Sequence, residues 1–327
     1  MGLLPFEKEQ RKLLIRADAS TNEDYGKKPY SRTTEELLEG SVICLNKPDG
    51  PTAHQVADYV KKILHVKKAG HGGTLDPGVT GVLPIAIGNA TRIMQAMLKG
   101  SKEYVCLMHI HKQVSADNIH KTSKNFIGNI MQMPPIKSAV KRELRRREIY
   151  YINILEIDKQ DVLFVVGCQA GTYIRKLCFN FGRALGTNAH MHHLIRTKAG
   201  PFSDKEWHSL IDLKDAYTLY LDGNDSELRK ILKPIEHAAR HLPNVYIFDS
   251  AVDNLCHGSQ LYVTGIVKVE SGIKVNDLVA VMTLKDELIC MGYAAITSDE
   301  MIKNEKGLAV KTSKVFMQIK TYPKNLV

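Results

Sequence analysis

Residues 70–84 read GHGGTLDPGVTGVLP, and this stretch decides how the chain is interpreted. Five glycines surround one carboxylate, Asp76, and the stretch leads directly into an apolar run at 82–87. Glycine is used where the backbone needs a positive φ or approaches another group closely. Aspartate before proline adopts an extended or turn conformation. The pattern predicts one acid on a constrained loop, and a carboxylate presented in this way can act as a covalent nucleophile.

Two other interpretations of this loop need to be weighed. Asp-Pro-Gly is ordinary turn chemistry, and for Asp76 taken alone a structural turn is the more frequent use. A phosphate cradle is disfavoured, because the chain contains no G-x-x-x-x-G-K-[S/T] motif and no lysine follows the glycines.

Composition limits the class of protein. The chain has 327 residues, 44% of them hydrophobic, so it has room for two domains. Its apolar runs are too short to cross a bilayer, and the N-terminus lacks an apolar signal core. The six cysteines contain no C-x-x-C pair, which disfavours a zinc ribbon or a disulfide framework. We therefore expect a cytoplasmic protein that does not bind membranes.

The charge distribution predicts a polyanionic partner. The formal net charge is +10, and six of the eleven residues at 137–147 are basic. Further lysines stand at 61, 62, 67, 68, 99 and 102, on both sides of the glycine-rich stretch. Any one such run can be a solvated face, but several runs around one candidate site favour a phosphate-binding surface.

Hydrophobic periodicity predicts an α+β chain. We expect strands at 41–46, 82–87, 102–110 and 161–168, and helices at about 7–16, 52–64, 90–98 and 173–185. Thr52 and Gln55 form a capping pattern for the second of these helices. Residues 1–40 are predicted to form an extension that packs on another part of the chain or is partly mobile.

The C-terminal part of the chain has a different residue pattern. Residues 232–244 resemble a linker with two prolines. Beyond it, short strands are expected at 246–248, 261–268, 277–284, 287–296 and 307–316, a pattern typical of a small β-barrel. The predicted division is an N-terminal extension at 1–40, a larger α+β domain at 41–240 and a small β-domain at 245–324.

Further motifs stand along the chain, and two of them contain a residue of possible functional interest. Tyr104 in K-E-Y-V could stack on a base, although a strand tyrosine is more often core. Arg175 in G-T-Y-I-R falls in the first turn of a predicted helix, where the helix dipole disfavours a cation. Such a misfit often marks a functional position. The remaining motifs are L-N-K-P at 45–48, P-P-I-K-S-A-V-K-R at 134–142, L-I-R-T at 194–197 and G-P-F at 200–202.

Together these motifs resemble, in order, those of the TruB-type pseudouridine synthases, and the resemblance covers roughly residues 40–320. It implies a pseudouridine synthase fold with a large mixed, mainly antiparallel sheet and a small β-barrel-like PUA domain. It also implies that Asp76 is the catalytic aspartate, that Arg175 pairs with it, and that Tyr104 stacks on the target base and removes its C5 proton. Whether Asp76 adds to C1′ or C6 of the uridine, or removes a sugar proton, is left open by the sequence.

The resemblance implies a wider RNA-binding set as well. Tyr173 is expected to pack on the target nucleotide and Leu194 to line the base pocket. The full set expected to contact substrate or RNA is His71, Tyr173, Leu194, Arg196, Lys47, Lys141, Arg142, Arg145 and Arg146. No cofactor or metal is expected: His190, His192 and His193 resemble a metal cluster, but their spacing supplies no further ligands.

The basic run after Pro135 and the PUA-like end resemble the archaeal branch that depends on box H/ACA guide RNA. The implied partners are the guide RNA, a target rRNA or tRNA, and small accessory proteins. A stand-alone synthase acting on the tRNA T-arm and a non-catalytic RNA-binding scaffold are the alternatives. The set of Asp76, Tyr104 and Arg175 disfavours the scaffold, which has no need of all three.

Overall fold

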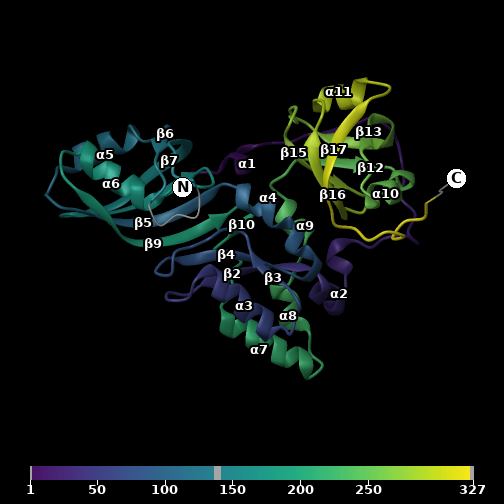
Figure 1. The fold of residues 1–327 in the computed structure, drawn as a ribbon, viewed down its shortest axis with the longest axis horizontal. Helices are drawn as coiled ribbons and strands as arrows, with labels where there is room; N and C mark the ends of the chain where they lie inside the picture. Colours follow the sequence, from purple (N-terminus) through teal and green to yellow (C-terminus); the bar gives the residue numbers. More distant parts are fainter. Residues whose placement is uncertain (1, 136–140, 325–327) are drawn as a thin grey trace.

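The computed structural model describes residues 2–135 and 141–324 and is built around two β-sheets (Figure 1). The larger sheet has ten strands, and eight of them follow the order β11-β2-β4-β9-β5-β8-β7-β6, with β10 beside β9 and β3 beside β4. Its strands are β2 (Ser41–Lys47), β3 (Ala69–His71), β4 (Thr80–Ile87), β5 (Lys102–Ile110), β6 (Gly128–Gln132), β7 (Arg145–Asp158), β8 (Asp161–Cys168), β9 (Ala189–Ala199), β10 (Phe202–Ser203) and β11 (Lys233–Pro234).

This sheet is mixed and mainly antiparallel. Only β4 and β9 run parallel among its paired strands in the described part of the chain, with Thr80 opposite Ile195 and Gly81 opposite Arg196. The parallel pair lies near the centre of the strand order, and β4 begins within the glycine-rich stretch. The α+β fold class expected from the sequence is therefore confirmed.

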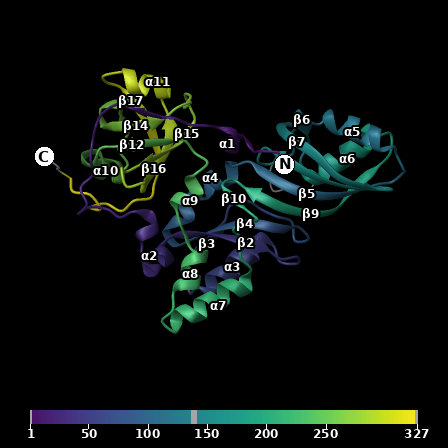
Figure 2. The same ribbon diagram turned by 180° about the vertical axis from the view of Figure 1, so that it is seen from behind.

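Helices cover this sheet in two groups (Figures 1 and 2). One group, α5 and α6, lies at the end formed by β5 to β8, whereas α3, α7 and α8 lie at the end formed by β2 and β3. The larger core cluster joins apolar residues of both groups to the sheet. The helices of this part are α3 (Ala53–Ile63), η2 (Gly88–Ile93), α4 (Met94–Lys99), α5 (Ala116–Lys124), α6 (Ile174–Ala184), α7 (Leu210–Leu221), α8 (Ser226–Ile231) and α9 (Glu236–Ala239).

The second sheet has seven strands in the order β1-β14-β12-β15-β16-β17-β13 and its own core. Its strands are β1 (Leu13–Ile15), β12 (Asn244–Ile247), β13 (Leu261–Tyr262), β14 (Ile266–Glu270), β15 (Leu278–Met282), β16 (Leu288–Ala294) and β17 (Leu308–Val315). The short helices α10 (Asp249–Cys256), η3 (Val263–Gly265) and α11 (Ser298–Lys303) accompany them.

The N-terminal segment connects the two sheets. It contains α1 (Pro5–Lys8), β1, η1 (Pro29–Ser31) and α2 (Thr34–Glu39), and both views show it passing from the larger sheet to the smaller one and back. Lys198 donates to Glu7 at 2.9 Å near its start. Arg32 donates to both carboxylate oxygens of Glu236, at 2.8 and 2.7 Å, near its end. The segment is thus packed on both parts of the chain.

Two expectations for the fold were wrong. No helix spans 7–16, because α1 ends at Lys8 and Leu13–Ile15 pairs with β14. Pairing with a distant strand overrides the local helical pattern. Residues 232–244 are not a loose linker either, since β11 pairs with β2 and α9 is buried between the two sheets. Within the described residues, every helix is too short or too polar to cross a bilayer.

Candidate active site

Asp76 lies on the loop between β3 and β4, which the parallel pairing of β4 and β9 holds at the centre of the large sheet. The Val79 amide donates to the Asp76 carbonyl at 3.0 Å, which closes a tight turn through Asp76-Pro77-Gly78. Leu75 and Val79 on either side are buried in the core, whereas Asp76 is exposed. The loop is therefore anchored by its apolar residues and presents its carboxylate outward.

Lys47 fixes one side of this loop. Its side chain is fully buried, and Nζ donates to the carbonyls of Pro77 at 2.8 Å and Val79 at 3.0 Å, and also to that of Pro48. The pKa of Lys47 is lowered, because the effect of burial exceeds the opposite effect of the Asp49 and Asp76 carboxylates. A buried charge needs such partners, so Lys47 stabilises the turn that carries Asp76.

Arg196 fixes the other side. It is 1% exposed, and its guanidinium donates to the carbonyls of Val82 at 2.7 Å, Gly73 at 3.1 Å and Thr74 at 3.4 Å. The planar fork of arginine suits several acceptors at once. Lys47 and Arg196 therefore hold backbone groups on both sides of Asp76.

Lys47 and Arg196 are expected from the sequence among the residues that contact RNA, and for both that expectation stays a prediction. Both side chains are buried. Lys47 donates to backbone carbonyls, and Arg196 donates to backbone carbonyls and hydrogen-bonds the Tyr104 phenol. A basic residue in a motif can be a buried structural cation, and the sequence pattern does not distinguish this from a surface contact.

The Asp76 carboxylate pairs with Arg175. Nη2 of Arg175 lies 2.6 Å from Oδ2 of Asp76, and the side chains are 62% and 57% exposed. Arg175 occupies the first turn of α6, which begins directly after Tyr173. The helix dipole disfavours a cation at the position of Arg175, and the Asp76 carboxylate compensates its charge. Because both side chains are exposed, the site remains open to a ligand.

Tyr104 is linked to the Asp76 loop through Arg196. It lies on β5 opposite Arg196 of β9, and Leu194 lies opposite Cys106 two positions along. Directly opposed residues of paired strands share a face, so Tyr104, Leu194 and Arg196 lie on the same side of the sheet. The pKa of the Tyr104 phenol is raised, because the effect of burial exceeds the opposite effect of the charge and hydrogen bond of Arg196.

His71 ends β3 next to the loop. Burial is the main cause that lowers its pKa, and the charges of His54 and Arg196 act in the same direction. Its Nδ1 is buried and has no hydrogen-bond partner among the described residues. The imidazole is therefore neutral near pH 7.

The basic run reaches the same site. Arg142 and Arg175 line one pocket of about 290 Å³. Its other lining residues are Lys176, Phe179 and the three that follow β6, Met133, Pro134 and Pro135. Lys141, Arg142 and Arg146 are exposed. Arg145 is half-buried and donates to Glu143 at 3.0 Å. Residues 136–140 of the P-P-I-K-S-A-V-K-R motif lie outside the described residues.

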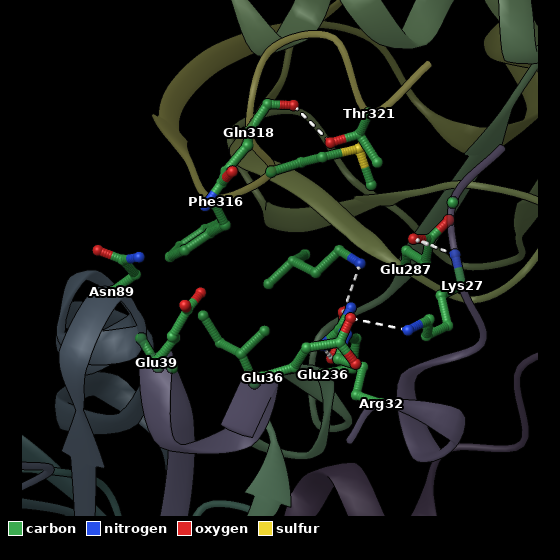
Figure 3. Close-up of a pocket in the computed structure, with 16 residues that line it drawn as sticks. Lys27, Arg32, Glu36, Glu39, Asn89, Glu236, Glu287, Phe316, Gln318 and Thr321 are labelled. Atoms are coloured by element: carbon green, nitrogen blue, oxygen red, sulfur yellow. Dashed lines mark hydrogen bonds and ion pairs between the residues drawn. The ribbon is translucent and has the colours of Figure 1, made fainter. Parts of the chain in front are cut away.

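A larger cavity, of about 410 Å³, lies away from this site (Figure 3). It is lined by the N-terminal segment, α9 and the residues that follow β17, and the Arg32–Glu236 ion pair lies in its wall. Four glutamates line it, Glu36, Glu39, Glu236 and Glu287, and it contains none of the expected site residues. Volume alone therefore does not identify the chemistry.

His190, His192 and His193 lie on β9 beside His109 and His111. His111 Nε2 and His190 Nδ1 are 2.9 Å apart. Among the described residues, no group of three or more histidine, cysteine, aspartate or glutamate side chains is placed to hold a metal ion.

Two residues near the site were not singled out from the sequence. Lys102 was noted as part of a basic run and of the K-E-Y-V motif, but no role was given to it. It is 5% exposed, donates to the carbonyls of Met97 and Gly100, and lies next to Gly73. Gln132 is 2% exposed and binds the backbone of Tyr173. Only its position directly before Met-Pro-Pro could have drawn attention to Gln132.

Comparison with protein families gives four adjacent matches. Residues 61–174 match the N-terminal domain of the TruB family pseudouridylate synthases, and residues 175–240 match the tRNA pseudouridylate synthase B C-terminal domain. Residues 243–316 match the PUA domain, and residues 3–57 match the DKCLD domain.

Whole proteins and solved structures also match over nearly the full chain. The chain is 50% identical to a probable tRNA pseudouridine synthase B of Methanopyrus kandleri, covering 98% of this chain and 95% of that one. It is 51% identical to that of Pyrococcus furiosus, with the same coverage. A chain in a crystal structure of a Cbf5–Nop10–Gar1 complex is 51% identical, with a TM-score of 0.95 and 99% of both chains covered. A chain in an H/ACA ribonucleoprotein bound to a substrate RNA containing 2′-deoxyuridine is 49% identical, with a TM-score of 0.93 and the same coverage.

Proposed function

We propose a function for this chain from one premise: it belongs to the TruB family of pseudouridine synthases. It is therefore an RNA pseudouridine synthase, an isomerase. In the reaction the N1–C1′ bond of a uridine breaks, the uracil turns and C5 bonds to C1′. C5 then loses its proton, and N1 gains one. Atoms and electrons balance within the nucleotide, so no redox partner is needed.

Asp76 is the reactive carboxylate in this proposal. The exposed pair with Arg175 at 2.6 Å is the single observation that supports this best. A guanidinium next to a carboxylate favours the ionised form and fixes its orientation. Lys47 and Arg196 keep the loop from moving when a nucleotide enters.

Tyr104 is proposed to stack on the flipped uracil and to take the C5 proton. A base enters such a site only when it leaves its stack, which costs about a few kcal/mol. Stacking on an aromatic ring offsets part of that cost. The phenol can take this proton only in its ionised form. Burial raises the pKa of Tyr104, and the charge and hydrogen bond of Arg196 oppose that effect by stabilising the phenolate.

The remaining contacts are assigned to substrate binding. Tyr173 and Leu194 are proposed to border the nucleotide, with His71 at the edge of the pocket. Lys141, Arg142, Arg145 and Arg146 are proposed to bind phosphates, because they follow the pocket that Arg175 also lines.

We infer that the enzyme works as the catalytic subunit of an archaeal box H/ACA ribonucleoprotein. The match to the Cbf5 chain extends over 99% of both chains, including the segment before residue 41 and the second sheet. The partners would be a guide RNA, a target RNA, and accessory proteins such as the Nop10 and Gar1 of that complex. We assign residues 41–240 to catalysis, 245–324 to guide binding, and 1–40 to an extension. All six cysteines are free thiols, which fits a cytoplasmic location.

The second candidate function is that of a stand-alone tRNA pseudouridine synthase, which the names of the curated relatives favour. Tritium release from C5-labelled uridine separates the two. The guide-dependent enzyme releases tritium from a target RNA only with a matching guide RNA and the accessory proteins. Release from tRNA alone, unchanged by the guide, would assign the chain to the stand-alone class.

A further inference from the structure

Gln132 joins two parts of the candidate site that are distant in sequence. It ends β6, where it lies opposite Arg145, the first residue of β7. β6 and β7 form a hairpin, called here the β6–β7 hairpin, and the basic residues Arg145 and Arg146 begin its second strand. Gln132 is buried, so it cannot itself bind RNA from this position.

Both polar groups of the Gln132 side chain bind the backbone of Tyr173. The Tyr173 amide donates to Oε1 of Gln132 at 3.0 Å, and Nε2 of Gln132 donates to the Tyr173 carbonyl at 3.2 Å. The same carbonyl accepts the first hydrogen bond of α6, from the amide of Leu177. The side-chain amide of Gln132 therefore binds the backbone at the N-terminus of α6.

A second contact follows the same route. Nε of Arg147 in β7 donates to the carbonyl of Gly171 at 3.1 Å, and the amide of Gln169 donates to the carbonyl of Glu148 at 2.8 Å. The β6–β7 hairpin thus holds the connection from β8 to α6 at several backbone groups. Two residues after Tyr173, Arg175 reaches Asp76.

We propose that Gln132 is a positioning residue of the synthase, which transmits the position of the β6–β7 hairpin to Tyr173 and to the Asp76–Arg175 pair. RNA held by the basic residues of the hairpin is in this way aligned with the reactive carboxylate. The inference rests on the proposed function for its effect on turnover, but not for its effect on the structure of 169–175.

Gln132→Ala removes both contacts and Gln132→Glu removes only one. A glutamate carboxylate still accepts from the Tyr173 amide, but it cannot donate to the Tyr173 carbonyl until it is protonated. Because burial raises the pKa of a carboxyl group, protonation falls in an accessible pH range. Gln160, in the turn between β7 and β8, is the matched control. Its Nε2 donates to the carbonyl of Ile110 at 2.9 Å, and Gln160 lines neither pocket described above.

The test measures kcat, RNA affinity and amide hydrogen exchange at 170–178 in the assembled particle. We expect Gln132→Ala to lower kcat by about a hundredfold, as small misplacements do, with RNA affinity within about threefold, as for a residue that does not touch the RNA. Exchange at 170–178 should accelerate. In Gln132→Glu the deficit in kcat relative to wild type should shrink as pH falls from 8 to 5.5. Gln160→Ala and Gln160→Glu should do none of this.

Unchanged kcat and unchanged exchange in Gln132→Ala would overturn the proposal, and so would equal losses in kcat and RNA affinity. If the alanine variant does not fold, the pH series of Gln132→Glu decides: a deficit independent of pH overturns it. If the wild type releases no tritium from any RNA, the proposed function fails, whereas amide exchange still decides the role of Gln132.

Discussion

Arg175 and Asp76, ninety-nine positions apart, meet at 2.6 Å between the first turn of α6 and the loop after β3. The pair is exposed, so it contributes little to folding, typically about 0–1 kcal/mol. Its importance lies in orienting the carboxylate.

Replacing Arg175 with methionine should leave the melting temperature nearly unchanged and lower kcat by about a hundredfold or more. Without the guanidinium, the ionised carboxylate loses its charge-assisted hydrogen bond and its fixed direction. Arg175→Lys should recover only part of the activity, because an ammonium lacks the planar fork. Wild-type turnover in the methionine variant would contradict the role given to the pair.

Replacing Tyr104 with phenylalanine should separate stacking from proton transfer. The aromatic face remains, so RNA affinity should stay within about threefold, whereas tritium release should fall by about 10²–10⁴, the range for a lost acid–base group. The two quantities are measured on the same labelled RNA. Equal tritium release by the variant and the wild type would exclude the phenol as the group that takes the C5 proton.

Gly81→Ala and Gly78→Ala form a matched pair in the catalytic loop. Gly81 has φ +105°, and a Cβ there would lie 2.2 Å from the carbonyl oxygen of Arg196. We expect Gly81→Ala to destabilise the fold by more than about 3 kcal/mol. At Gly78 the nearest atom is 3.9 Å away, so its alanine variant should stay within about 0.5 kcal/mol. Urea unfolding measures both, and equal stabilities would contradict the close approach of β4 to β9.

Lys102 should make stability depend on pH. Burial lowers its pKa from 10.5 to about 7, and Arg196 acts in the same direction. Below pH 7 both folded and unfolded chains carry the charge, and the full penalty of burying it is present. Between pH 7 and 10.5 the unfolded chain binds more protons, so this residue's share of the unfolding free energy rises with pH.

Lys102→Met removes that titration. The free energy of unfolding of wild type minus that of the variant should therefore increase from pH 7 to pH 10, measured by urea unfolding at pH 6, 8 and 10. A difference that does not change with pH would show that the Lys102 ammonium is not held at a lowered pKa.

Local patterns predicted some elements closely and missed others. Strands β5 and β8 and helix α3 lie within a residue or two of the predicted positions, because their periodicity, and the capping pair Thr52–Gln55, act locally. Leu13–Ile15 was assigned to a helix because the sequence does not show that β14, more than 250 residues away, pairs with it. The helices α10 and α11 were missed between short strands.

In the candidate site too, some residues could be predicted from the sequence and others could not. Asp76 and Arg175 stand out by their residue types and positions, whereas Tyr104 and the roles of all three follow from the resemblance of their motifs to those of the family. The burial of Lys47 and Arg196 could not be predicted, since it depends on carbonyls of a loop that the fold brings to them. Gln132 carries no motif of its own, and its function follows only from its contact with Tyr173.

The central claim is that the Asp76 carboxylate performs the isomerisation of uridine. The most direct measurement is tritium release from C5-labelled uridine in a guided target RNA by Asp76→Asn, with RNA affinity measured in parallel. Asparagine has nearly the same shape but cannot be ionised. We predict no tritium release above background and an RNA affinity within about threefold of wild type, as expected for a group that acts in chemistry rather than in binding. Tritium release at the wild-type rate by Asp76→Asn would contradict the claim.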